Sequence, residues 1–175
     1  SIKVPGGPLT SRLQHINVGD EIEVGTKTTG TLTLANLELG GDLWMLATGT
    51  GIAPFISLLR DPETYDHFDQ IHVYWSVRTS AELQAYDSFL QEQGVKYTAT
   101  VTQDPTWKGQ NKRITKFITA GRVANDSNPS KHKVMICGGL DFNNDMSDMF
   151  KSRGFTEGTR KTRGSFVQER AFVDR

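Results

Sequence analysis

The stretch LWMLATGTGIAP, residues 43–54, decides the fold. Its first five residues are continuously apolar, as expected for a strand that a parallel sheet buries on both faces. Gly49 and Gly51 follow this strand directly, and Pro54 suits the first turn of a helix, which we expect to run to Arg60. A buried strand, a glycine-rich turn and a helix together form the opening unit of an α/β domain.

Strands and helices continue to alternate on the C-terminal side of this stretch. Thr79 and Glu82 have the spacing of a capping box, and Asp141 can cap a helix that Gly154 ends. The sequence therefore predicts a Rossmann-like α/β domain with a parallel five-stranded sheet and right-handed crossovers. Besides residues 43–47, we expect strands at residues 71–77, 96–102, 134–137 and 165–167, and a helix at residues 113–120.

The first forty residues have a different character. Short extended segments at residues 1–4, 21–24 and 30–34 are predicted to be strands, and residues 10–16 a short helix. Three short strands cannot cover a core by themselves. We therefore interpret residues 1–40 as part of an antiparallel β-barrel and residues 41–175 as a second domain.

Composition excludes several classes of function. Twenty basic and twenty acidic side chains cancel, which disfavours a general nucleic-acid binder. The single cysteine, Cys137, excludes an intrachain disulfide framework and a Cys-rich zinc site, and the four histidines show no ligand spacing, so no metal site is predicted. No apolar run is long enough to span a bilayer. We expect a cytoplasmic protein without nucleic-acid or membrane partners.

The turn at residues 48–54 is the strongest candidate site. Bare glycine backbone between a strand and a helix can approach a pyrophosphate, although an ordinary βα turn is the alternative. Gly138 and Gly139 end another predicted strand, and the carboxyl ends of parallel strands meet in one crevice. Cys137 would lie at the lip of that crevice, or it is simply a small buried hydrophobe.

Charge at the end of the second strand bears on the type of nucleotide. An NAD-specific fold usually has an acid there to hold the ribose 2′-hydroxyl. This chain has Arg78 and no acid between Ile71 and Ser80, and a guanidinium suits a 2′-phosphate. The pattern favours NADP. A second basic group, which is either part of the same site or a solvated face, comprises Lys108, Lys112 and Arg113.

Five motifs in order resemble the ferredoxin–NADP+ reductase family, especially its bacterial branch: GPLTSRL, LATGTGIAPF, SVR, VMICGG and ERAFVDR. The resemblance covers almost the whole chain. It implies a FAD-binding β-barrel followed by an NADP-binding α/β domain. It also implies that FAD exchanges hydride with NADP(H) and single electrons with ferredoxin or flavodoxin.

The resemblance also implies roles for particular residues. Residues 8–10 resemble the segment that binds the flavin pyrophosphate, and Thr50 resembles a FAD contact from the second domain. Cys137 resembles the cysteine near the nicotinamide, and Ala171 the residue beside the flavin ring, so these two are expected at the reacting rings. The full set of expected cofactor-binding residues is Pro8, Leu9, Thr10, Thr48, Gly49, Thr50, Gly51, Pro54, Val77, Arg78, Arg113, Gly138, Ala171 and Phe172.

Two departures from the family pattern change the expectations. The RxYS segment and the first half of the barrel are absent, so we expect this chain to hold FAD weakly or not at all. Gln103 stands where the family pattern has arginine. Loss of that positive charge should weaken binding of a 2′-phosphate unless Lys108 or Lys112 takes its place. A non-catalytic nucleotide-binding module and the reductase component of an oxygenase are the alternative functions.

Overall fold

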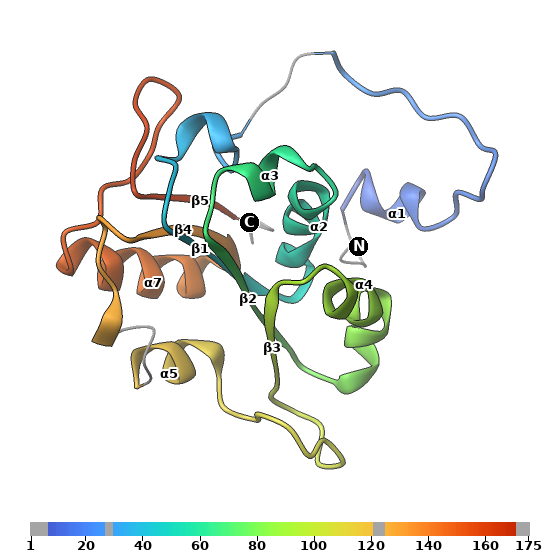
Figure 1. Ribbon diagram of the computed structural model, residues 1–175. Coiled ribbons are helices and arrows are strands. Elements are labelled where there is room, and N and C mark those ends of the chain that lie inside the picture. The colour runs from blue at the N-terminus through green and yellow to red at the C-terminus, as the bar shows by residue number, and fades with distance from the viewer. Residues whose placement is uncertain (1–6, 27–29, 121–124, 171–175) are drawn as a thin grey trace. The chain divides into compact units, whose positions relative to one another are not determined.

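The computed structural model describes residues 7–26, 30–120 and 125–170 (Figure 1). Its internal contacts divide the chain into two compact units, Ser1–Gly30 and Thr31–Arg175. The division falls after Gly30 rather than after residue 40, where the composition changes. Leu32 and Leu37 explain the difference, because both are buried in the core of the second unit.

The second unit is built on a five-stranded parallel sheet, as the sequence predicts. The strand order is β3-β2-β1-β4-β5, so the chain adds two strands on one side of β1 and then crosses to the other side. The direction of winding therefore reverses next to β1. The strands are β1 (Asp42–Thr48), β2 (Gln70–Val77), β3 (Lys96–Val101), β4 (His132–Gly138) and β5 (Phe166–Arg170).

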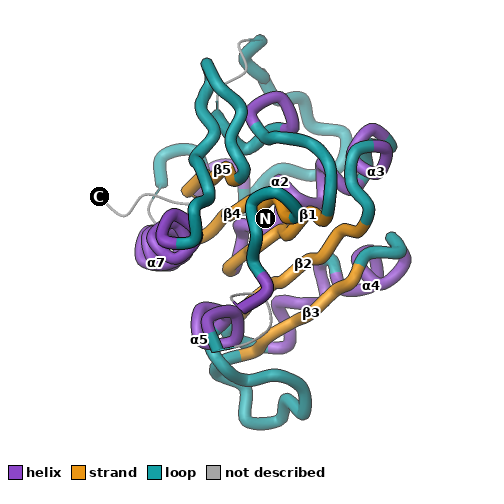
Figure 2. The backbone as a smooth tube through the Cα atoms, turned by 60° about the vertical axis from the view of Figure 1, so that its left-hand side comes forward, coloured by secondary structure: helices purple, strands orange, loops and turns teal. Residues whose placement is uncertain are grey.

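Helices cover both faces of this sheet (Figure 2). One face is covered by α2 (Ala53–Leu59) and α4 (Asp87–Glu92), and the other by α5 (Ile114–Thr119) and α7 (Leu140–Ser152). The shorter elements of this unit are η1 (Leu34–Asn36), η2 (Gly49–Ile52), α3 (Glu63–Asp66) and η3 (Ser80–Ala85). None of the described helices is long and apolar enough to cross a membrane.

The central strand shows why its sequence is apolar at every position. Leu43 and Met45 belong to the core beneath α2 and α4, whereas Trp44 and Leu46 belong to the core beneath α5 and α7. Successive side chains of a strand point to opposite faces, so burial on both faces requires an unbroken apolar run. The continuous LWMLA segment thus produces the central strand of the predicted three-layer domain.

Several helix boundaries differ from the expected ones. The helix expected from Pro54 begins at Ala53 and follows directly on the 3-10 turn η2. The capping box is present, with the Thr79 N–H donating to Glu82 Oε1 at 2.9 Å, but it opens the 3-10 helix η3 before α4 begins. Asp141 is not the cap of α7, because Gly139 occupies that position and Asp141 lies within the first turn.

The strands expected before the sheet are not found among the described residues. Residues 21–24 lie in irregular backbone with Ile22 and Val24 exposed, and residues 30–34 lead into the turn η1. An extended segment becomes a strand only when a neighbour takes up its backbone hydrogen bonds, and no described segment does so here. The helix expected at residues 10–16 is the shorter α1 (Thr10–Leu13). The strand expected at residues 1–4 lies outside the described residues.

Candidate functional site

The reversal of winding beside β1 defines the candidate site. Parallel strands bring their carboxyl ends to one edge of the sheet, and a crevice forms where the crossovers leave in opposite directions. Here Thr48 ends β1, and its two neighbours end at Val77 in β2 and Gly138 in β4. The tertiary structure therefore brings together three segments that the sequence analysis singled out separately.

The turns after β1 and β4 are in close contact. Thr48 Oγ1 accepts a hydrogen bond from the Gly139 N–H at 3.2 Å. A Cβ atom on Gly138 would lie 2.2 Å from that same Oγ1, and one on Gly51 would lie 2.1 Å from the Cys137 carbonyl oxygen. Gly51 and Gly138 are therefore required by the approach of the two turns, which is a structural reason independent of any ligand.

Gly49 differs from Gly51 in its surroundings. Its φ of 52° lies in the left-handed region, and a Cβ built on it would meet nothing within 4 Å. Its carbonyl oxygen accepts a hydrogen bond from Trp75 Nε1 at 2.8 Å, which ties the turn to β2. Of the two glycines in this turn, Gly49 is thus the one whose backbone faces open space and can be approached closely by a ligand.

The 3-10 turn η2 makes the glycine residues themselves the start of a helix. The first N–H groups of a helix have no partner within it. Because η2 begins at Gly49 and continues into α2, these groups belong to the residues around Gly49, Thr50 and Gly51. Pro54 lies in the first turn of α2, as expected, where its missing N–H costs nothing. The local chemistry suits an anionic group.

Arg78 follows β2 at the same edge of the sheet and is exposed. Its carbonyl oxygen accepts a hydrogen bond from the Gln103 N–H at 2.8 Å, and the Val77 carbonyl accepts one from the Thr102 N–H at 3.1 Å. The ends of β2 and β3 are therefore joined, with Gln103 beside Arg78. Among the residues that the structure describes, no carboxylate forms an ion pair with the Arg78 guanidinium.

Asp104 is a residue of this region that the sequence analysis missed. Its carboxylate accepts hydrogen bonds from both the N–H and the hydroxyl of Ser80, and from the N–H of Thr106 at 2.9 Å and its hydroxyl at 2.6 Å. These bonds to the charged form hold the pKa of Asp104 well below its usual range. An acid from the loop after β3 thus reaches the loop after β2, although β2 itself ends without one.

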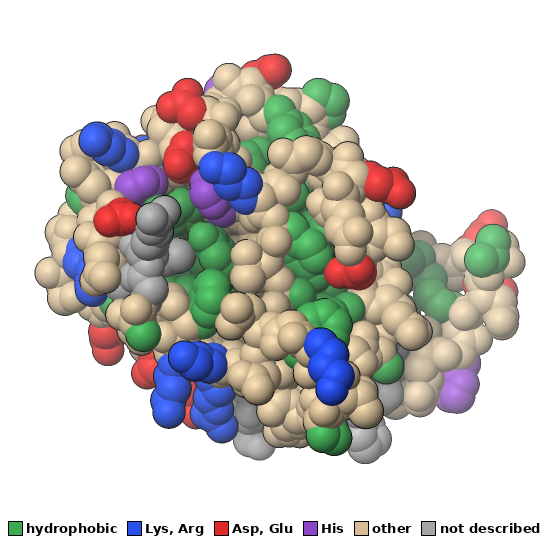
Figure 3. All heavy atoms as spheres, turned by 60° about the horizontal axis from the view of Figure 1, so that its bottom comes forward, with side chains coloured by type: hydrophobic (Ala, Val, Ile, Leu, Met, Phe, Trp, Pro, Cys, Tyr) green, Lys and Arg blue, Asp and Glu red, His purple; other side chains and the backbone are tan. Residues whose placement is uncertain are grey.

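Arg113 and the basic residues before it lie in the long connection from β3 to α5. The Gln110 carbonyl accepts a hydrogen bond from the Val101 N–H at 2.9 Å, which returns the loop to the end of β3. Arg113 then occupies the position before α5, and it is exposed, as are Lys108 and Lys112. Figure 3 views the molecule from this loop's side and shows groups of Lys and Arg side chains there.

Cys137 is a buried residue of the sheet core, with 3% of its surface exposed. Burial, with a smaller effect from the charge of Glu169, its neighbour on β5, raises the pKa of its thiol to about 12. The thiol is therefore protonated at neutral pH and is not a nucleophile. Its packing agrees with the small buried hydrophobe considered above, while a position beside a nicotinamide stays a prediction.

Apart from Thr50 in η2, whose contact with FAD stays a prediction, the expected flavin-binding residues belong to the first unit or to the terminus. Leu9 precedes α1 and is exposed, and the Thr10 hydroxyl donates a hydrogen bond to the Gly7 carbonyl at 3.4 Å. Their role toward a flavin, like that of Pro8, stays a prediction. Ala171 and Phe172 lie outside the described residues.

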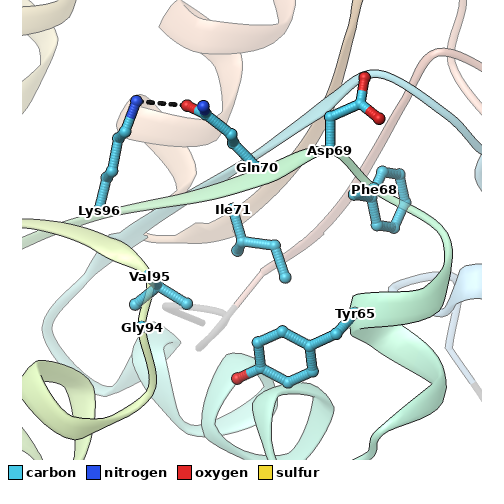
Figure 4. A pocket seen from close by; sticks show the side chains of 8 residues that line it. All are labelled: Tyr65, Phe68, Asp69, Gln70, Ile71, Gly94, Val95 and Lys96. Atoms are coloured by element: carbon cyan, nitrogen blue, oxygen red, sulfur yellow. Dashed lines mark hydrogen bonds between the residues drawn. The ribbon is translucent and has the colours of Figure 1, made fainter.

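One pocket of about 310 Å³ opens at the opposite edge of the sheet (Figure 4). It lies at the beginning of β2 and β3, where Lys96 donates a hydrogen bond to Gln70, and Tyr65 and Phe68 form its wall. None of the expected cofactor-binding residues lines it. The candidate site described above is therefore separate from this pocket.

Comparison with known proteins gives first the class of domain. Residues 45–148 match the family model for the oxidoreductase NAD-binding domain. This range begins within β1, ends within α7 and contains both glycine turns as well as Arg78 and Asp104.

Relatives then define the family. The chain is 40% identical over 191 residues to ferredoxin–NADP reductase A of Sorangium cellulosum, covering 99% of this chain and 68% of that protein. It is 42% identical over 190 residues to a flavodoxin/ferredoxin–NADP reductase of Rhodobacter capsulatus, covering 99% and 70%. The chain belongs to the ferredoxin–NADP reductase family, as its motifs indicated.

A solved structure supports the same assignment. The structure of a ferredoxin NADP+ reductase from Neisseria gonorrhoeae with bound FAD and NADP superimposes with a TM-score of 0.80 at 27% sequence identity. The match covers 97% of this chain and 72% of that one. The members of the family named here are oxidoreductases.

Proposed function

We propose that this chain is the NADP(H)-binding portion of a ferredoxin/flavodoxin–NADP+ oxidoreductase that works in the cytoplasm with FAD. Bound FAD supplies the exchange of hydride with NADP(H) and of single electrons with ferredoxin or flavodoxin. The observation that carries the proposal is the turn at Gly49, which offers accessible backbone at the reversal of the sheet with Arg78 exposed nearby. Family membership supports the same function.

Different residues of the site bind different parts of the coenzyme. Accessible backbone at Gly49 and the free N–H groups of η2 bind the pyrophosphate. Arg78 binds the 2′-phosphate, and Arg113 adds positive charge from the loop before α5. The turn after β4, with Gly138 and the protonated Cys137, presents a small uncharged surface to the nicotinamide. No proton has to be moved by these residues, because hydride transfer needs no general acid or base.

Arg78 provides the direct test of coenzyme binding. Loss of a charged bidentate contact costs about 1.5–3 kcal/mol, so Arg78→Ala should weaken NADP+ binding roughly tenfold to a hundredfold and NAD+ binding much less. Calorimetric titration of both coenzymes measures this. Arg160→Ala removes another exposed arginine and serves as the control. Equal affinity of the unmodified chain for the two coenzymes would contradict a role for Arg78 in selecting NADP.

The flavin part of the proposal needs a separate experiment. Pro8, Leu9 and Thr10 are proposed to contact the flavin pyrophosphate, and Ala171 and Phe172 to lie beside the flavin ring. An absorption spectrum of the purified whole protein would show flavin bands if FAD is bound, and NADPH should bleach them. A whole protein that binds NADP+ but no FAD would instead favour a nucleotide-binding module without redox activity of its own.

A further inference from the structure

Asp104 lies 26 positions after Arg78 in the sequence, but hydrogen bonds bring the two residues close together. The hydrogen bond from the Gln103 N–H to the Arg78 carbonyl fixes the residue immediately before Asp104. The Ser80 N–H donates a second hydrogen bond, to Asp104 Oδ2, at 3.2 Å. Ser80 is two residues beyond Arg78, so its Cα lies at most about 7.6 Å from that of Arg78. The carboxylate therefore stands beside the segment that carries the guanidinium.

The charge of Asp104 is fixed and not neutralised by a counterion. Within the described residues, its hydrogen-bond donors belong to Ser80 and Thr106, and both are uncharged. In the described part of the chain, no Lys, Arg or His forms an ion pair with it. Hydrogen bonding to the ionised form keeps it a carboxylate at any physiological pH. A stationary negative charge is thus built into this end of the sheet.

We propose that Asp104 is a specificity-determining residue of the coenzyme site. Its carboxylate repels the 2′-phosphate and so reduces the preference for NADP over NAD that Arg78 provides. This inference rests on the proposed function. NADP and NAD differ only in the 2′-phosphate, which carries close to two negative charges. A nearby carboxylate repels that group and has no such effect on the 2′-hydroxyl of NAD.

Gln103 strengthens the argument. It adjoins Arg78 through the backbone hydrogen bond, and its side chain carries no charge. A neutral side chain there leaves Arg78 and the Asp104 carboxylate as the charged groups at the joined ends of β2 and β3, with Arg113 contributing from the loop before α5. The balance of charge at the end of β2 and β3 is therefore less favourable to a 2′-phosphate than Arg78 alone suggests.

Asp104→Asn tests the proposal because asparagine removes the charge and retains the shape. Its carbonyl oxygen can accept the two hydrogen bonds from Thr106 and its amide N–H can donate to the Ser80 hydroxyl, while the Ser80 N–H loses its acceptor. Repulsion between a unit charge and a phosphate about 8–10 Å apart in a mostly aqueous setting corresponds to roughly a threefold to tenfold change in affinity at low salt. We expect calorimetric titration to show NADP+ binding that much tighter in Asp104→Asn, with NAD+ binding unchanged. The gain should shrink when the salt concentration is raised.

A matched control is available at Asp61. This exposed carboxylate accepts a hydrogen bond from the N–H two residues later, Glu63, at 3.0 Å, in the same kind of turn that Asp104 forms with Thr106. It lies after α2, away from the strand ends that form the site. Asp61→Asn should leave the affinity for both coenzymes as it is in the unmodified chain.

The outcomes separate the inference from the function on which it rests. Equal changes for NADP+ and NAD+ in Asp104→Asn, or no change in either, would overturn the inference and assign Asp104 a structural role only. An unmodified chain that binds neither coenzyme would instead refute the proposed function. Asp104→Ser supplies a second neutral variant, and its circular dichroism spectrum checks that the fold is retained.

Discussion

Replacing Gly51 with alanine tests the explanation given for the two glycine turns. The added Cβ would lie 2.1 Å from the Cys137 carbonyl oxygen and 2.6 Å from its carbonyl carbon, whereas ordinary contacts are 3.4–4 Å. These are backbone atoms of β4, which is hydrogen-bonded to a strand on each side. The strand cannot yield without breaking the sheet, so the turn after β1 has to move instead.

The expected cost follows from that movement. Forcing extra volume into a packed core costs about 1–3 kcal/mol. Separation of the two turns also breaks the hydrogen bond from the Gly139 N–H to Thr48 Oγ1, and leaving this partly buried donor unpaired costs about 1–2 kcal/mol more. We therefore expect Gly51→Ala to lower the free energy of unfolding by roughly 2–5 kcal/mol. At about 2–4 °C per kcal/mol for a chain of this size, the melting temperature should fall by roughly 4–20 °C.

Gly49→Ala is the matched control, because it adds the same methyl group two residues earlier. Its Cβ would meet nothing within 4 Å, and only the left-handed φ of 52° opposes the substitution, at about 1–2 kcal/mol. Urea unfolding, followed by circular dichroism and tryptophan fluorescence, measures both variants. NADP+ binding should weaken in Gly49→Ala, since the methyl group stands where the pyrophosphate approaches. If Gly51→Ala were as stable as Gly49→Ala, steric contact with β4 would not be the reason for glycine at position 51.

Three further predictions follow from individual side chains. Cys137 should resist a thiol reagent at pH 8 in the folded chain and react in urea, because burial raises its pKa to about 12; rapid labelling of the folded chain would contradict this. Burial also lowers the pKa of His72 in the folded chain below its ordinary value of 6.5. The stability that neutral His72 contributes is therefore complete above pH 6.5 and is lost as the pH falls through the lowered folded-state pKa. His72→Gln should therefore lose less stability between pH 7 and pH 5 than the unmodified chain, whereas His15→Gln, which alters an exposed histidine, should not differ from it. Gln103→Arg should tighten NADP+ binding about tenfold relative to NAD+, and an equal effect on both coenzymes would exclude contact with the 2′-phosphate.

Local sequence determined most of the α/β domain. The five segments predicted to be strands became the five parallel strands. The continuously apolar segments of β1 and β4 are buried on both faces, whereas the alternating β3 is only partly buried. The capping box at Thr79 and the positive φ of Gly154 at the end of α7 were likewise predictable, since both depend on residues within one turn. Glycines placed directly after predicted buried strands identified the turns at Gly49 and Gly138 as candidate site segments.

Other features depended on segments distant in the sequence. Residues 21–24 have the composition of a strand but not the structure, because a strand requires a partner for its backbone hydrogen bonds. Gly51 could be read as a ligand-binding glycine, and only the packing of β1 against β4 showed that the Cys137 carbonyl leaves no room for a side chain. Asp104 was absent from the predicted site because the acid of an NAD-binding fold is expected at the end of the second strand, whereas Asp104 follows the third. The pairing of β2 with β3 brought that carboxylate to Ser80, and such pairing is set by the register of the whole sheet rather than by any local pattern.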